Sequence, residues 1–334
     1  MTRFSASPAT PVGRRAVLWA VAGAALGAAA GCSGAAASRA RPAPWSSGTA
    51  SPWPSPALPR TTAWRPTSAE VDPEVKLRAV RLVEAIGAWP YGHGGRAAAR
   101  SRVAALGLGL PRDLVDQAGP LLPAADQAAL QVVDAQYGGI LARSASVPVV
   151  CRQWTRHSAT VRAGGTTVDV RLFRSARGWS VDALHPARPG PAAASPAPDV
   201  RAVLSDDRIT LPPAAAADLR SGQVHSSVTK AMLALSGTYR LGVSVVRSGH
   251  PLDVFGTSRP SDHPRGRAFD VWQIDGHTVV LPTTPRSLIE RFMRDAAAAG
   301  SYNVGGPVLL TGGSPGQFFS DATHHDHVHI GFRS

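Results

Sequence analysis

The chain has 334 residues, of which 44% are hydrophobic and 17% charged, so it is neither wholly disordered nor fibrous and is long enough for about two domains. Its 33 glycines and 29 prolines are clustered, which indicates linkers between folded parts. The formal net charge is +13, but the arginines that supply it are scattered along the chain, whereas a nucleic-acid binder clusters its basic residues. We therefore expect no nucleic-acid partner.

The N-terminus has the features of an export signal. Arg14 and Arg15 precede an apolar run, residues 16–30, which is shorter than the roughly 20 residues that span a membrane. Small residues then lead to Cys32, as in the lipobox of bacterial lipoproteins, where the cysteine is lipidated and becomes the mature N-terminus. We expect residues 1–32 to be a signal peptide and Cys32 to hold the protein at the outer face of the cytoplasmic membrane through a lipid anchor only. The alternative is an ordinary signal peptide and a secreted protein.

Two segments have the composition of linkers. Residues 33–69 are rich in alanine, serine, proline and arginine without periodicity, and they predict a disordered tether. Residues 187–204 predict a second linker, rich in proline and alanine. If Cys32 carries lipid, Cys151 has no cysteine partner, so we expect no intramolecular disulfide.

Residues 70–186 are predicted to form a small α+β domain. Apolar residues at helical spacing follow Asp72, a candidate N-cap, and a second helix is predicted over Pro123–Gln136. Period-two alternation then predicts strands within 167–183, with a hairpin at Gly164-Gly165 before them. The Gly-x-Trp-x-Val ending resembles the cone-shaped fold of nuclear-transport-factor-two-like domains. No catalytic set is visible in this region, so we expect it to be a spacer or a ligand-docking module.

Residues 205–334 are predicted to form a second α+β domain. Apolar periodicity and capping residues indicate alternating short strands and helices. The predicted helices are 226–236 and 285–299, and the predicted strands are 241–247, 268–274, 308–310 and 327–332.

The candidate chemistry lies in two clusters of this second region. Residues 261–270 contain His263 and Asp270, and residues 324–329 contain four histidines. A catalytic zinc takes three protein ligands, drawn from His nitrogen and carboxylate oxygen, and leaves a fourth position open. Either cluster alone is also compatible with a hydrogen-bonded structural pair or a solvated tail. Burying an unpaired carboxylate is costly, however, so Asp270 on an apolar strand needs a cation beside it.

The two clusters together resemble a family of zinc peptidases. The Ser261-x-His263-x-x-Gly266-x-Ala268-x-Asp270 pattern is similar to that of the D-alanyl-D-alanine carboxypeptidases and dipeptidases, which belong to the superfamily of lysostaphin and hedgehog proteins. The resemblance covers residues 205–334. It implies a hedgehog/DD-peptidase fold, an antiparallel sheet with helices that holds one zinc ion. It also implies hydrolysis of D-Ala-containing stem or cross-link peptides of peptidoglycan.

The resemblance also implies roles for single residues. His263, Asp270 and His329 are the implied zinc ligands, and Asp326 is the implied general base toward the attacking water. His327 is a second candidate base, because residues two apart on a strand point the same way and it therefore neighbours His329.

The turn that carries a carbonyl-polarising arginine in this family reads Arg247-Ser248-Gly249-His250-Pro251 here, with proline at the arginine position. Arg247 or His250 is the candidate substitute, and His250 and Ser261 are candidate substrate-binding residues. Loss of the arginine also favours an alternative of another class: a non-catalytic, zinc-containing module that binds cell-wall peptides or a partner.

Overall fold

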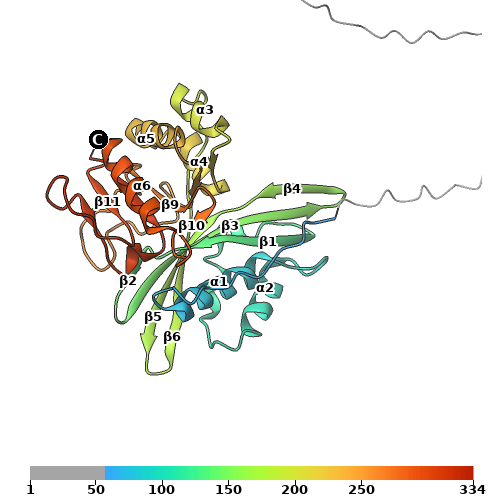
Figure 1. The fold of residues 1–334 in the computed structure, drawn as a ribbon. Coiled ribbons are helices and arrows are strands. Elements are labelled where there is room, and N and C mark those ends of the chain that lie inside the picture. The colour runs from blue at the N-terminus through green and yellow to red at the C-terminus, as the bar shows by residue number, and fades with distance from the viewer. Residues whose placement is uncertain (1–56, 334) are drawn as a thin grey trace, which may run out of the picture. The chain divides into compact units, whose positions relative to one another are not determined.

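The computed structural model of the protein describes residues 57–333 (Figure 1). The expected signal peptide, Cys32 and the first part of the expected tether lie outside these residues. Residues 57–69 form neither helix nor strand, but the Thr62 amide donates to Gln131 Oε1 at 2.8 Å. Within the described range, no helix is long and apolar enough to cross a membrane.

The fold is α+β, as predicted, with two sheets that each have their own hydrophobic core. The first sheet is antiparallel and has the order β1-β3-β5-β6, with β2 and β4 also paired to β3. Helices α1 and α2 lie together beside it (Figure 1), and α1 packs on β1 and β3. Its elements are α1 Pro73–Gly87, α2 Gly95–Ala104, β1 Gln127–Ala135, β2 Gly139–Ile140, β3 Ser144–His157, β4 Thr160–Gly164, β5 Thr167–Ser175 and β6 Gly178–Pro186.

Helix α1 forms as its sequence predicts. Asp72 is its N-cap residue and Pro73 follows at the first helical position, where a missing N–H costs nothing. The apolar residues at three- and four-residue spacing, among them Val75, Leu82 and Ile86, are all buried against the sheet.

The helix predicted over 123–136 is wrong, because this segment forms strand β1. Ala128, Leu130 and Val132 are buried in alternation with more exposed neighbours, which is a period of two and fits a half-buried strand. The alanines favour a helix locally, but pairing with the long strand β3 overrides that weak preference.

The hairpin predicted at Gly164-Gly165 is also wrong. The turn lies at residues 158–159, and β4 and β5 then pair with successive parts of β3. Gly165 is needed for another reason: its φ is +145°, and a Cβ there would lie 2.1 Å from the carbonyl oxygen of Cys151.

The second sheet is mixed and has the order β12-β11-β13-β9-β8-β7, with β10 paired to β9. Pairs β7–β8 and β11–β12 are parallel, and the others are antiparallel. Its elements are α3 Pro198–Ser205, β7 Ile209–Thr210, α4 Pro213–Arg220, α5 Ser226–Ser236, β8 Leu241–Val243, β9 Ala268–Ile274, β10 His277–Thr278, α6 Arg286–Ala298, β11 Asn303–Gly305, β12 Phe318–Phe319 and β13 Val328–Gly331.

Most elements predicted for this region are confirmed, including both helices and strand 268–274. The strand predicted over 308–310 is wrong, because these residues pair with no other strand. Val308 and Leu310 pack on the core while Leu309 is 65% exposed, so the side chains alternate in burial without belonging to a sheet. The strand predicted over 241–247 ends at Val243. The predicted linker 187–204 is irregular until helix α3 begins at Pro198.

Candidate metal centre

Strand register places two of the predicted ligands side by side. Asp270 lies on β9 and His329 on β13, and these residues are direct partners across the antiparallel pair. His263 lies in the loop that precedes β9, in a turn closed by a hydrogen bond from the Gly266 amide to the His263 carbonyl at 2.8 Å. His263 and Asp270 are fully buried, and His329 is 8% exposed.

The ligand atoms of these three residues form a small triangle. His263 Nε2 lies 3.1 Å from both Asp270 Oδ1 and His329 Nδ1, and His329 Nδ1 lies 3.0 Å from Asp270 Oδ1. Metal–ligand bonds of about 2.0–2.1 Å in a tetrahedral zinc site separate neighbouring ligand atoms by roughly 3.3–3.4 Å. A slight outward shift of the side chains therefore admits one metal ion.

Neighbouring acceptors and donors orient the ligands. The Nδ1 of His263 lies 2.8 Å from the carbonyl oxygen of Val246. Because a carbonyl can only accept, Nδ1 carries the hydrogen and the Nε2 lone pair faces the triangle, the arrangement typical of metal-binding histidines. Gln136 donates its Nε2–H to Asp270 Oδ2 at 2.5 Å, which leaves Oδ1 facing the triangle.

His250, a predicted substrate-binding residue, also lies at this cluster. Its ligand atoms and those of His263 and Asp270 are all within 4.8 Å of one another, close enough to hold a metal ion. The His250 ring lies 4.1 Å from the His263 ring, and its Nδ1 is 3.1 Å from the Pro251 carbonyl oxygen, so its Nε2 lone pair is free to bind. Sequence reasoning missed this role, and the only signal for it was the position of His250 in the turn before His263.

The electrostatics of the cluster suit a cation. Burial lowers the pKa of His329 to about 4 and that of His250 well below its ordinary value. Burial works to raise the pKa of Asp270, but the His263 and His327 rings outweigh it and hold that pKa well below its ordinary value. Burial works to lower the pKa of His263, but the Asp270 carboxylate outweighs it and raises that pKa, so positive charge is favoured where a metal ion would lie. Imidazole nitrogens beside one ionised carboxylate are the donors that zinc and related transition metals prefer.

Asp326, the expected general base, points away from the triangle. Its Oδ1 accepts from His327 Nδ1 at 2.5 Å, and its Oδ2 accepts from the Tyr137 amide at 3.0 Å and pairs with the Lys76 ammonium at 2.6 Å. Burial works to raise the pKa of Asp326, but Lys76 and His327 outweigh it and lower the pKa to about 2. It is His327 that faces the cluster, with its Nε2 3.8 Å from Asp270 Oδ1.

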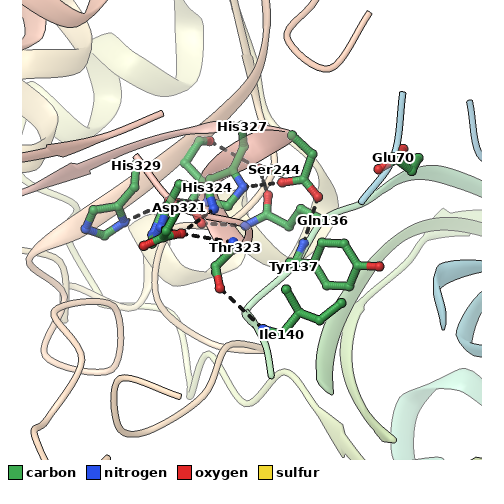
Figure 2. Close-up of polar contacts among 12 residues, drawn as sticks. Glu70, Gln136, Tyr137, Ile140, Ser244, Asp321, Thr323, His324, His327 and His329 are labelled. Atoms are coloured by element: carbon green, nitrogen blue, oxygen red, sulfur yellow. Dashed lines mark hydrogen bonds and ion pairs between the residues drawn. The ribbon is translucent and has the colours of Figure 1, made fainter. Parts of the chain in front are cut away.

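Figure 2 shows the Gln136 side chain, from the segment after β1, pointing toward Ser244 of the second region, whereas the Tyr137 ring points away from the cluster. Arg247, a predicted catalytic residue, is not brought to the cluster. Its guanidinium lies 3.7 Å from Asp218 Oδ1 and donates to Gln223 Oε1.

A cavity of about 650 Å³ opens beside the candidate ligands. Ser261, a predicted substrate-binding residue that is 5% exposed, lines it together with His250 and His329. The first region also contributes to its wall through Tyr137 and the residues that follow it.

Gly266 is expected to be essential to the turn that presents His263. Its φ is +67°, and an added Cβ would lie 2.1 Å from the carbonyl oxygen of Gln223. Gly266→Ala should therefore lower the free energy of unfolding by at least about 2 kcal/mol, measured by urea denaturation. Gly276→Ala is the matched control, because Gly276 has a φ of +82° but open space around it. Equal losses in the two variants would contradict the steric argument.

No protein-family model, no curated protein and no solved structure matches this chain. The fold and the site define an α+β protein with a candidate metal centre built from β9, β13 and the loop before β9.

Proposed function

We propose that the protein is an exported zinc-dependent peptidase that hydrolyses D-Ala-containing stem or cross-link peptides of peptidoglycan. The observation that carries the proposal is the triangle of His263 Nε2, Asp270 Oδ1 and His329 Nδ1, with sides of 3.0–3.1 Å, built from residues of the two separated clusters at 261–270 and 324–329. The proposal includes the hedgehog/DD-peptidase fold for residues 205–334. It also includes lipidation at Cys32 and location at the outer face of the cytoplasmic membrane.

In this proposal His263, Asp270 and His329 hold the zinc ion, and His250 borders the open side. When bound, zinc supplies a Lewis acid that activates water and polarises a peptide carbonyl. His327 accepts the proton of the attacking water at Nε2. Its Nδ1–H is donated to Asp326, so Nε2 is directed at the cluster. Burial works to lower the pKa of His327, but Asp270 and Asp326 outweigh it and raise that pKa to about 8, so Nε2 carries the lone pair of a base above that pH. Asp326 then orients the base and is not itself the base.

The cavity supports a peptide substrate. The aromatic side chains of Phe255 and Phe319 line it, and these can cover an extended backbone. Arg259 and Arg333 also line it and are exposed, so they offer positive charge to the free carboxylates of a stem peptide.

The test is digestion of purified muropeptides by the full chain, with and without a chelator, followed by mass analysis. Loss of a terminal D-Ala, of a dipeptide or of a cross-link identifies a carboxypeptidase, a dipeptidase or an endopeptidase. Chelation should stop the reaction, and added zinc should restore it. Hydrolysis that ignores the chelator would contradict the proposed role of the metal.

One observation favours a second candidate function, a zinc-containing module that binds wall peptides without cutting them. Arg247 is held by Asp218 and Gln223, and both carboxylate oxygens of Asp326 are occupied. Stoichiometric zinc together with unchanged muropeptides that co-sediment with the protein would support this candidate over the peptidase.

A further inference from the structure

Helix α1 of the first region carries a buried lysine that reaches the candidate site of the second. Lys76 is 1% exposed, and its ammonium forms ion pairs with Glu70 and, at 2.6 Å, with Asp326. The ammonium also lies 4.9 Å from the centre of the Tyr137 ring. A lysine is rarely buried unless it is paired, and this one is paired across 250 residues of sequence with the segment that precedes β13.

Asp326 links this lysine to the proposed base. One of its oxygens accepts from Lys76 and from the Tyr137 amide, and the other accepts from His327 Nδ1. A carboxylate held at both oxygens cannot rotate without breaking one of these contacts. The direction of the His327 ring is therefore set by a group that is itself fixed from the first region.

A second contact from the first region acts on a candidate ligand. Gln136, fully buried immediately after β1, donates to Asp270 Oδ2 and accepts from the Ser244 hydroxyl. Lys76, Gln136 and the Tyr137 amide thus hold two different parts of the cluster, the proposed base and one proposed ligand. This arrangement does not fit the expectation that residues 70–186 are only a spacer.

We infer that Lys76 is a positioning residue for the proposed hydrolysis, which makes the first region a necessary part of the catalytic apparatus. The inference rests on the proposed function, since it assigns to Lys76 the alignment of His327 through Asp326. Removing the ammonium leaves Asp326 buried without its cation, and the carboxylate no longer holds the Nδ1 side of His327 in one place. Because Lys76 touches neither the ligands nor the substrate cavity, zinc and substrate binding should survive its loss.

The test uses the full chain and the variant Lys76→Met, which keeps the length of the side chain and removes its charge. We expect kcat to fall by about 10- to 100-fold, the range typical of residues that orient a metal site, while KM and zinc content stay the same. Lys230→Met is the matched control, because Lys230 is the only other lysine of the chain and is exposed on α5. If the wild-type protein hydrolyses muropeptides and Lys76→Met has the same kcat, the inference is overturned and the proposed function stays intact.

A second measurement does not depend on activity or on the stability of a Lys76 variant. With two lysines in the chain, an amine-reactive reagent followed by mass analysis compares Lys76 with Lys230 directly. In the native protein Lys76 should react far more slowly, and Asp326→Ala should speed its reaction selectively. Equal labelling of the two lysines in the native protein would overturn the inference. Zinc-loaded wild-type protein without turnover on any muropeptide would overturn both the proposed function and this inference.

Discussion

Asp270→Ala should abolish zinc binding and hydrolysis together. Asp270 Oδ1 forms two sides of the ligand triangle, and its other oxygen is held by Gln136. Loss of partners that merely orient ligands lowers metal affinity by about 10- to 100-fold, so loss of a ligand should lower it by more than about 100-fold. Competition with a chromophoric chelator measures the affinity, and turnover is followed on the same samples.

Asp207→Ala is the control for this variant, because Asp207 is an exposed aspartate of the same region. It should keep both zinc and turnover. An Asp270→Ala protein with one tightly bound zinc per chain would contradict the assignment of Asp270 as a ligand. It would leave the histidines at positions 250, 263 and 329 as the candidate set.

His327→Ala should keep zinc and lose turnover by about 10²–10⁴-fold, the usual contribution of a general base. The reason is geometric: His327 Nε2 faces the cluster at 3.8 Å from Asp270 Oδ1, whereas both oxygens of Asp326 are engaged elsewhere. Asp326→Asn should have a smaller effect, because the amide oxygen can still accept from His327 Nδ1, although the amide nitrogen then faces two donors, the Lys76 ammonium and the Tyr137 amide. Steady-state kinetics beside zinc stoichiometry measures both variants.

The control here is His277→Ala, which removes an exposed imidazole on β10 and should change nothing. Full loss of turnover in Asp326→Asn with normal turnover in His327→Ala would return the role of base to Asp326. Loss of zinc in His327→Ala would instead make His327 a ligand.

Much of the second region follows from local sequence rules. The strand 268–274 and the helices at 226–236 and 285–299 form where periodicity and capping predict them, because these segments bury one face in a core of their own. The same rules bring Asp270 and His329 together, because both lie on apolar segments that pair in one sheet.

The contribution of the first region could not be predicted in this way. Gln136 stands at the end of a segment whose alanines favoured a helix, and it reaches Asp270 only because that segment is a strand. Lys76 lies on the apolar stripe of its helix, three, four and seven residues before the buried Ala79, Val80 and Val83, so the local pattern indicates its burial but not its partner Asp326. Contacts across 134 and 250 residues depend on how two sheets meet, which periodicity does not encode.

In the proposed mechanism, the ion pair between Lys76 of α1 and Asp326 couples two equilibria, the binding of substrate and the packing of α1. Coupling between two sites is reciprocal: whatever one ligand does to a distant contact, that contact does to the affinity for the ligand. A substrate that binds better when His327 is aligned therefore stabilises the packing of α1 in the proposed mechanism. By the same factor, a molecule that binds α1 changes the affinity for substrate. Helix α1, which follows the expected tether, is thus a second place at which the proposed hydrolysis can be changed, either by a force on the helix or by a molecule that immobilises it.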